Sequence, residues 1–278
     1  MPRACNKPEF GPCMQAAATL LTDWGLAYPV AHVLILCHHA VELTPKPKAW
    51  LSWSSGKDSA WSLHVMRQRG DIEITALLTT INRTHNRVAM HAVRESLLDA
   101  QAAAAGRPLV KVPIPSPCPN EIYERAMAEA MAQARAAGVT HMIFGDLFLE
   151  DIRKYREENL AKCGIVPVFP LWGRDTRILA QEMLAGGLRA VLTCVDPKKL
   201  DATFAGRAFD EKLLADLPAS VDPCGENGEF HTVACAGPMF ASPIRVTVGE
   251  IVMRDGFVFA DVLPVERRQE SCLDAPMS

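Results

Sequence analysis

Between residues 49 and 195, short apolar segments alternate with longer segments whose apolar residues recur at helical spacing. The short segments have the length of strands, and several of the longer ones stop at a glycine. Strict alternation of strand and helix predicts a parallel sheet with right-handed crossovers. The predicted strands are 49–53, 73–79, 109–114, 141–144, 166–170 and 189–195, and the predicted helices are 90–105, 121–137, 147–162 and 173–184, with one more directly after Ser59.

After residue 195 the pattern changes to a mixture of elements. Residues 198–217 have helical spacing, and the segment 222–232 is rich in polar and turn-forming residues. A tight hairpin turn is predicted at Arg254-Asp255-Gly256. Strand composition is found in three segments, 232–236, 245–253 and 257–263.

Residues 1–48 do not share this organisation. The apolar run 30–43 is interrupted by histidines and is too short to span a bilayer. We expect an appended, partly ordered extension, or a start codon assigned too far upstream. His38 and His39 could be metal ligands, but a third ligand is not nearby in sequence, which argues against a metal site. The predicted parts are an extension, 1–48; an α/β parallel-sheet domain, 49–195; a smaller α+β domain, 196–265; and a polar tail, 266–278.

A loop of small and polar residues follows the first predicted strand. Its small residues let backbone N–H groups approach a ligand, and the N-terminus of the next helix attracts anions. Lys57 adds a positive charge to this loop, and Asp58 or Ser59 is the expected N-cap of the helix. We expect Lys57 and Asp58 to be loop residues whose side chains have little burial. We predict a phosphate site at the carboxyl end of this strand, although an ordinary strand-to-helix turn is the alternative. Its members are Ser54, Ser55, Gly56, Lys57, Asp58 and Ser59.

Two better-known loops are excluded at this position. A Walker A loop requires glycine where Leu51 stands and a hydroxyl residue where Asp58 stands. A nucleophile elbow requires glycine on both sides of a serine, which neither Ser54 nor Ser55 has.

The segment 222–232 is the second place where ionisable side chains gather. Glu226, Glu229 and His231 lie a few residues apart, with glycines between them, and are candidates for acid–base groups, Mg²⁺ ligands or hydrogen-bond partners of a substrate. Because histidine titrates near neutrality, His231 is the stronger candidate for proton transfer. Cys224 would be a nucleophile if His231 lowered its pKa. The alternative is a solvated, glycine-rich connection.

Composition limits the function classes. The chain has 278 residues, 49% of them hydrophobic, and a formal net charge of −3. It therefore does not have the composition of a disordered protein, and no electrostatic argument favours nucleic acid as the main partner. The nine cysteines include no C-x-x-C pair, which argues against a zinc ribbon or a dithiol redox site and favours free thiols in the cytoplasm.

The loop resembles the pyrophosphate loop of the N-type ATP pyrophosphatases, usually written Ser-Gly-Gly-x-Asp-Ser. These enzymes cut ATP between the α- and β-phosphates. Ser55 replaces the first glycine of that motif. If the position requires a positive φ, Ser55 carries strain of about 1 kcal/mol; otherwise its hydroxyl is an additional phosphate donor.

Four motifs together resemble the diphthine–ammonia ligase family: the loop itself, Gly145-Asp-Leu-Phe-Leu-Glu-Asp-Ile-Arg153, Pro170-Leu-Trp-Gly173 and 222–232. The resemblance implies an adenine nucleotide alpha-hydrolase-like (HUP) domain with a small carboxy-terminal domain closing over it. It also implies that ATP and ammonia convert a carboxylate to an amide through an acyl-adenylate, with release of AMP and pyrophosphate. Residues carried over by position are Ser54 to Ser59 for the phosphates, Asp146 and Glu150 lining the crevice, and Glu226, Asn227, Glu229 and His231 facing the acyl acceptor.

One stretch departs from the eukaryotic and archaeal pattern Glu-Gly-Gly-Glu-Phe-Glu-Thr. The chain has Glu226-Asn-Gly-Glu-Phe-His-Thr232, a form similar to the bacterial branch. Bacteria lack diphthine, so the acyl substrate stays open.

The resemblance implies an ATP-dependent C–N ligase that forms AMP, and the free cysteines favour the cytoplasm. Asp58 is the expected Mg²⁺ ligand. The expected partners are a small-molecule or protein-borne carboxylate and ammonia, without a membrane or nucleic acid, and a homodimer is left open. Two alternatives remain: a regulatory protein that binds an adenine nucleotide without turnover, and a tRNA-modifying ATP pyrophosphatase, which the charge and the missing C-x-x-C disfavour.

Overall fold

A computed structural model describes residues 45–82, 87–88 and 93–265. The expectations for residues 1–44, including His38 and His39, and for the tail 266–278 lie outside these residues. From Lys46 on, the described residues belong to one compact unit. No helix in this described part of the chain is long and apolar enough to cross a membrane.

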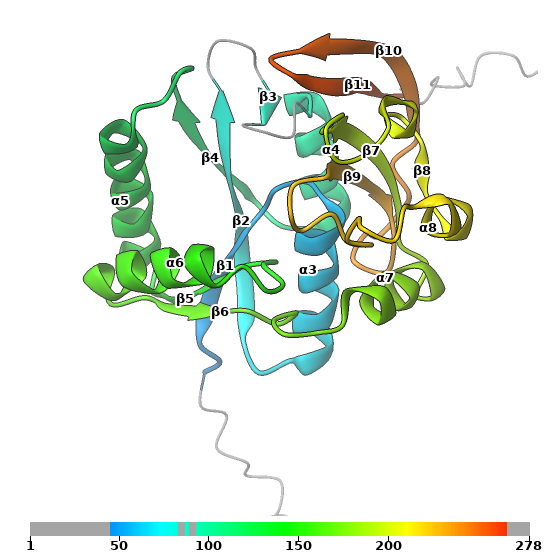
Figure 1. The fold of residues 1–278 in the computed structure, drawn as a ribbon. Coiled ribbons are helices and arrows are strands. Elements are labelled where there is room, and N and C mark those ends of the chain that lie inside the picture. Colours follow the sequence, from blue (N-terminus) through cyan, green and yellow to red (C-terminus); the bar gives the residue numbers. More distant parts are fainter. Residues whose placement is uncertain (1–44, 83–86, 89–92, 266–278) are drawn as a thin grey trace, which may run out of the picture. The chain divides into compact units, whose positions relative to one another are not determined.

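The first sheet has five parallel strands in the order β4-β2-β1-β5-β6, and a short strand, β3, lies antiparallel to the end of β2 (Figure 1). The chain order reverses between β1 and β5, which is where open α/β sheets bind their ligands. This confirms the predicted parallel-sheet fold. The strands are β1 (Lys48–Ser52), β2 (Glu73–Asn82), β3 (Arg87–Val88), β4 (Leu109–Ile114), β5 (Val139–Ile143) and β6 (Val166–Val168).

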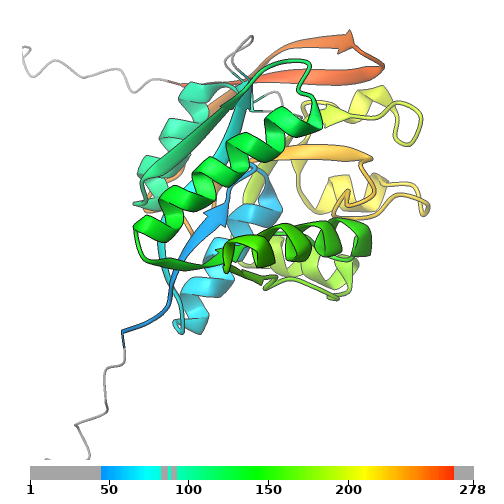
Figure 2. The same cartoon turned by 90° about the vertical axis from the view of Figure 1, so that its left-hand side faces the viewer.

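Helices cover both faces of this sheet because its strands send alternate residues to opposite sides. Leu51 packs in one hydrophobic cluster with residues of α3 (Lys57–Arg69) and α4 (Glu95–Ala105). Trp50 packs in the other cluster with residues of α5 (Asn120–Ala136) and α6 (Glu150–Cys163). Figures 1 and 2 show α5 and α6 on the same side of the sheet, with α3 on the opposite side.

The second sheet has the order β10-β11-β7-β8, and β9 also pairs with β7. The predicted hairpin turn is confirmed, because Asp255 and Gly256 have φ angles of 53° and 82° between β10 and β11. The strands are β7 (Arg189–Val195), β8 (Ala208–Phe209), β9 (Phe230–Ala236), β10 (Val246–Arg254) and β11 (Phe257–Pro264).

Two predictions of elements are wrong. Residues 189–195 do not complete the parallel sheet; as β7 they follow helix α7 (Thr176–Ala185) and form the centre of the antiparallel sheet. A continuous apolar run is compatible with either position, so its composition could not decide between the sheets. Residues 198–217 are not one helix, because Gly206 adopts a φ of 80° and interrupts it. This segment contains a 3₁₀ turn at Ala202–Phe204, β8, and a short helix α8 (Glu211–Asp216).

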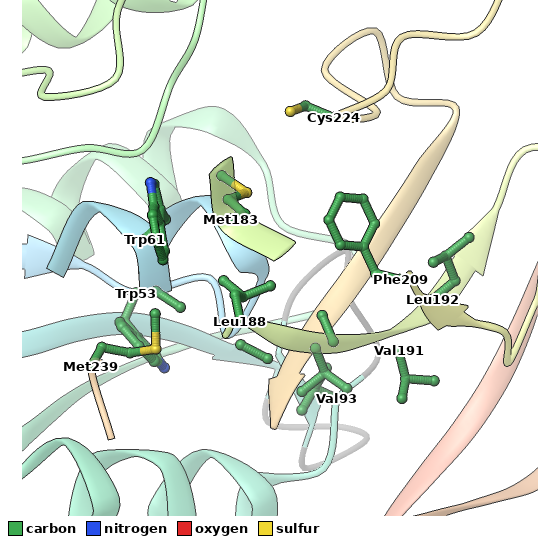
Figure 3. Packing of buried hydrophobic residues seen from close by; sticks show 14 of the residues in the cluster. Trp53, Trp61, Val93, Met183, Leu188, Val191, Leu192, Phe209, Cys224 and Met239 are labelled. Atoms are coloured by element: carbon green, nitrogen blue, oxygen red, sulfur yellow. The ribbon is translucent and has the colours of Figure 1, made fainter. Parts of the chain in front are cut away.

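One hydrophobic cluster joins the two sheets. Trp61 on α3, Met183 on α7 and Phe209 on β8 are buried members of this cluster (Figure 3). Since α3 also contacts β9, the helix that follows the first strand is packed between the parallel sheet and the second sheet. This packing brings residues 222–232 to the loop Ser54–Ser59, which we call the phosphate loop after the ligand predicted for it.

Candidate active site

A cavity of about 300 Å³ opens at the carboxyl ends of β1 and β5, where the strand order reverses. Its walls come from the loop after β1, the segment after β5 and the stretch that leads into β9. The lining residues are Ser52, Ser54, Gly56, Lys57, Asp58, Ser59, Phe144, Gly145, Asp146, Leu149, Arg156, Cys224, Gly225, Glu226, Gly228, Phe230, His231 and Thr232.

The phosphate loop is closed by its own hydroxyl groups. The backbone N–H of Gly56 donates to Ser54 Oγ at 3.3 Å, and Ser59 Oγ donates to the carbonyl of Gly56 at 3.0 Å. The two hydroxyl oxygens of Ser54 and Ser59 lie 3.1 Å apart. Gly56 is the N-cap of α3 and no side chain caps the helix, so the expected N-cap at Asp58 or Ser59 is wrong. In the first turn of α3, the backbone N–H of Lys57 is bound by Thr232 Oγ1 of β9, and Lys57, Asp58 and Ser59 line the cavity.

Ser55 occupies the left-handed region, with a φ of 69°. Its side chain is fully buried, does not line the cavity and finds no hydrogen-bond partner for Oγ among the described residues. Because the φ angle is positive, the strain interpretation applies to Ser55.

Gln101 on α4 connects the phosphate loop to the second sheet. Its Nε2 donates to the carbonyls of Ser55 at 2.9 Å and Ala234 at 2.7 Å, and its Oε1 accepts from Trp53 Nε1 at 2.9 Å. Its side chain is fully buried, so each of these bonds is made away from water. Nothing in the sequence marks this residue, because a single glutamine in an alanine-rich helix gives no local signal.

Lys57 is buried, with 2% of its surface exposed, which contradicts the expectation of an exposed loop residue. Its Nζ donates to Asp58 Oδ2 at 2.9 Å and to the carbonyl of Cys224, and its backbone N–H donates to Thr232 Oγ1 at 3.1 Å. Burial is the largest influence and lowers the pKa of Lys57, but Asp58, Cys224 and Glu226 together outweigh it and the net shift is upward. The lysine therefore stays charged and holds the two halves of the site together.

Asp58 presents an unsatisfied carboxylate oxygen. Its Oδ1 is buried and has no hydrogen-bond partner among the described residues, and the side chain lines the cavity. Within those residues, no group of three or more His, Cys, Asp or Glu side chains could hold a metal ion by itself. An ion at Asp58 would therefore need further oxygen ligands from a substrate or water.

Glu226 is the carboxyl group of the cavity that titrates near neutrality. Its Oε1 accepts a hydrogen bond of 2.8 Å from the backbone N–H of Leu147. Burial raises the pKa of Glu226 from 4.5 to about 7, and the charge of Asp58 adds to this rise. At neutral pH this side chain can therefore both accept and release a proton.

His231 lines the cavity but does not titrate near neutrality, contrary to the expectation. Burial, together with the charge of Lys57, lowers the pKa of His231 to about 4. The imidazole is therefore neutral at physiological pH. Glu226 takes its place as the candidate for proton transfer.

Glu229 and Asn227 shape the loop and do not line the cavity. Glu229 Oε1 accepts from the backbone N–H of Asp222 at 3.0 Å and from Asn227 Nδ2 at 3.2 Å, and the Glu229 side chain is buried. Asn227 itself is exposed, and its carbonyl accepts from Lys199 Nζ at 2.6 Å. These contacts fix the backbone that carries Glu226.

Cys224 lies in the buried cluster shown in Figure 3. Its thiol donates to the carbonyl of Thr176 at 3.4 Å, and burial raises the pKa of Cys224. The group is a thiol at neutral pH and not an activated nucleophile.

Asp146 and Glu150 differ in their placement. Asp146 lines the cavity and forms a two-bond ion pair with Arg156, with distances of 2.6 Å from Nε to Oδ2 and 3.0 Å from Nη2 to Oδ1. Glu150 is exposed in the first turn of α6 and does not line the cavity, unlike the expectation. Arg156 has no distinguishing signal in the sequence, because it lies in a helix rich in charged residues.

Gly145 packs against the start of α3. A Cβ atom at this position would lie 2.9 Å from the backbone carbon of Asp58 and 2.9 Å from the backbone nitrogen of Ser59. Glycine therefore allows the chain after β5 to cross the phosphate loop closely.

Two models of protein domains and several curated proteins match segments of this chain. The model of the diphthamide synthase N-terminal domain matches residues 48–166, and that of the C-terminal domain matches residues 175–264. Diphthine–ammonia ligase from Bos taurus and that from Homo sapiens are each 32% identical over 120 residues, which are 41% of this chain and 45% of the relative. For the Danio rerio protein the identity is also 32% over 120 residues, 41% of this chain and 47% of the relative.

The chain thus spans less than half the length of the curated relatives it matches. The assignment to a bacterial branch stays a prediction. Because the two domain models match adjacent segments in the order of the two sheets, the chain belongs to the diphthamide synthase family that includes the diphthine–ammonia ligases.

Proposed function

We propose that this protein is an ATP-dependent ligase that joins ammonia to a carboxylate, through an acyl-adenylate, with release of AMP and pyrophosphate. The observation that carries the proposal is that one cavity is lined both by the phosphate loop and by Glu226, a carboxyl group whose pKa is about 7. The relatives' name, diphthine–ammonia ligase, supports the same reaction class.

In the first half of the reaction, the phosphates of ATP lie at the N-terminus of α3. The helix N-terminus and the charge of Lys57 favour the β- and γ-phosphates there. A substrate carboxylate oxygen attacks the α-phosphorus, a new O–P bond forms, and the bond from the α-phosphorus to the bridging oxygen breaks. Pyrophosphate leaves with that electron pair, close to the loop that binds it best.

In the second half, the nitrogen of ammonia attacks the acyl carbon, and AMP leaves with the electrons of the C–O bond. Ammonium must lose a proton before it can attack, and the amide nitrogen must lose one afterwards. Glu226, with a pKa of about 7, is the group on this cavity that is suited to accept a proton. A positioned base of this kind contributes roughly 10²–10⁴-fold to a rate.

Mg²⁺ fits this site only in combination with the nucleotide. Asp58 Oδ1 is the buried, unpaired oxygen that would bind the ion. When bound, Mg²⁺ would neutralise part of the phosphate charge, which Lys57 alone does not balance.

The deciding experiment is pyrophosphate release from ATP across a panel of carboxylates, with and without ammonium. The proposal requires AMP and pyrophosphate as products, and release of ADP and phosphate would overturn it. Nucleotide binding without turnover would favour the regulatory alternative, whereas stimulation by tRNA would favour a tRNA-modifying enzyme. Exchange of labelled pyrophosphate into ATP isolates the first half, and it should persist in a Glu226→Gln variant that no longer forms the amide.

A further inference from the structure

A second cavity, of about 280 Å³, lies between α5 and α6 and above β5. Its wall is mostly apolar and includes the side chains of Met127 and Met131 from α5, Met142 from β5 and Leu160 from α6. We call it the α5–α6 cavity. None of these four residues belongs to the phosphate loop or to residues 222–232.

The α5–α6 cavity shares two wall residues, Phe144 and Arg156, with the active-site cavity. The guanidinium of Arg156 lies 4.3 Å from the ring centroid of Phe144 and uses Nε and Nη2 to pair with Asp146. Among the described residues, its Nη1 has no hydrogen-bond partner. A guanidinium with one donor nitrogen outside its ion pair with Asp146 therefore stands at the boundary of the two cavities.

We propose that the α5–α6 cavity binds the apolar body of the acyl substrate, and that Arg156 binds its carboxylate at the boundary with the active site. This inference rests on the proposed ligase function. The volume is at the low end of the range for ligand pockets, so the body is small, such as an aryl or branched alkyl group. Tyr123, whose pKa burial raises, keeps its phenol proton and offers one polar contact inside an apolar wall.

A nucleobase fits the same cavity less well. Reading the edge of a base requires paired donors and acceptors, and the one side-chain amide of the wall is Asn159. Its Nδ2 donates to the carbonyl of Tyr155 at 3.0 Å, and its Oδ1 accepts from Lys162 at 2.9 Å. Both polar atoms are already used within α6. The unused donor of Arg156 binds an ionised carboxylate more strongly than a neutral ribose hydroxyl.

The test measures binding in the absence of turnover. The probes are small carboxylic acids with aryl or branched alkyl groups, and the matching primary amides, titrated against the full-length protein by ligand-observed NMR and calorimetry. ATP affinity is measured separately. Met127→Trp fills the half-buried wall of the cavity, and Ala132→Trp places the same ring on the exposed side of the same helix as a control.

We expect at least one acid to bind the wild-type protein and the Ala132→Trp variant, and Met127→Trp to weaken that binding by about tenfold or more with ATP affinity unchanged. Arg156→Gln should remove the preference for an acid over its amide. A parallel loss of ATP affinity in Met127→Trp would assign the cavity to the nucleobase and overturn the inference. Binding of no acid, or equal binding to both Trp variants, would also overturn it. If acids bind as expected but release no pyrophosphate from ATP, the ligase function fails and the carboxylate pocket stands.

Discussion

The backbone N–H of Lys57 donates a hydrogen bond of 3.1 Å to Oγ1 of Thr232, across a sequence separation of 175 residues. It joins the first residue of α3 to β9 of the second sheet. The backbone of Gly56 also packs tightly against β9, because a Cβ atom added to Gly56 would lie only 3.3 Å from the carbonyl oxygen of Thr232. The phosphate loop and residues 222–232 are therefore two halves of one site, and changes at this junction should affect both.

Replacing Thr232 by valine should destabilise the protein and weaken nucleotide binding. The substitution keeps the shape of the side chain but leaves the buried N–H of Lys57 without an acceptor, which costs about 1–3 kcal/mol. Denaturant unfolding and calorimetric titration with ATP measure the two effects. Thr232→Ser keeps the hydroxyl and should stay close to the wild type. Equal stability of Thr232→Val and the wild type would mean that the hydrogen bond contributes nothing.

Lys57→Met should abolish ATP turnover and also lower stability. The sequence pattern predicts a loop lysine with little burial, whose substitution would leave the fold intact. Lys57 is instead buried, and its ammonium binds Asp58 and the carbonyl of Cys224. Leaving these partners unpaired costs about 1–3 kcal/mol. The exposed Lys212→Met is a matched control with the same change of charge. Wild-type nucleotide affinity in a folded Lys57→Met protein would refute the phosphate site.

The amide-forming step should become faster as pH rises, with a midpoint near the pKa of Glu226, about 7. Only the carboxylate form accepts a proton, so Glu226→Gln should lower the rate of this step by roughly 10²–10⁴-fold. The pH dependence of the remaining rate should then have no midpoint near pH 7. His231→Asn should keep the midpoint, because burial holds the pKa of His231 at about 4. If the histidine variant loses the midpoint and the glutamine variant keeps it, the proton-transfer assignment is reversed.

Glu226 should also influence stability in a direction set by its raised pKa. Between pH 4.5 and about 7 the folded protein holds this proton while the unfolded chain has lost it. The contribution of Glu226 to the free energy of unfolding is therefore full below pH 4.5, falls as pH rises and levels off above about 7. Glu226→Gln lacks this contribution, so its stability relative to the wild type should be higher at pH 8 than at pH 5. An unchanged difference between these pH values, in denaturant unfolding, would contradict the raised pKa.

Gly145→Ala should weaken ATP binding although it adds only one methyl group. The added carbon would lie 2.9 Å from the backbone of Asp58 and Ser59, so the start of α3 or the chain after β5 must move, at a cost of about 1–3 kcal/mol. Gly138→Ala is the control, since a Cβ atom there would meet no atom within 4 Å, and its positive φ affects stability away from the site. The two variants separate a loss of affinity from a loss of stability. Equal ATP affinity in both would show that the close approach of Gly145 does not matter for the phosphate loop.

The positions of the motifs relative to the elements could be predicted from the sequence. The loop Ser54–Ser59 was placed between a buried strand and a helix, and the strands from 49 to 168 were placed in a parallel sheet. These features are encoded locally, by apolar periodicity and by turn residues, so a short window of sequence contains the signal. The positive φ of Ser55 was left open by the sequence, and only the structure decided between strain and an additional phosphate donor.

Other properties were decided by the tertiary structure alone. Whether 189–195 completes the first sheet or forms the centre of the second depends on which strands compete for its edges, and composition does not record that. The pKa of Glu226 lies near 7 and that of His231 near 4, unlike the expectation for His231, because a pKa depends on burial and on charges such as that of Lys57, which is far away in sequence. The partners of Gln101 and Arg156 are equally non-local. The sequence by itself therefore determined which groups are available for chemistry, and the packing of the second sheet against α3 determined which of them meet.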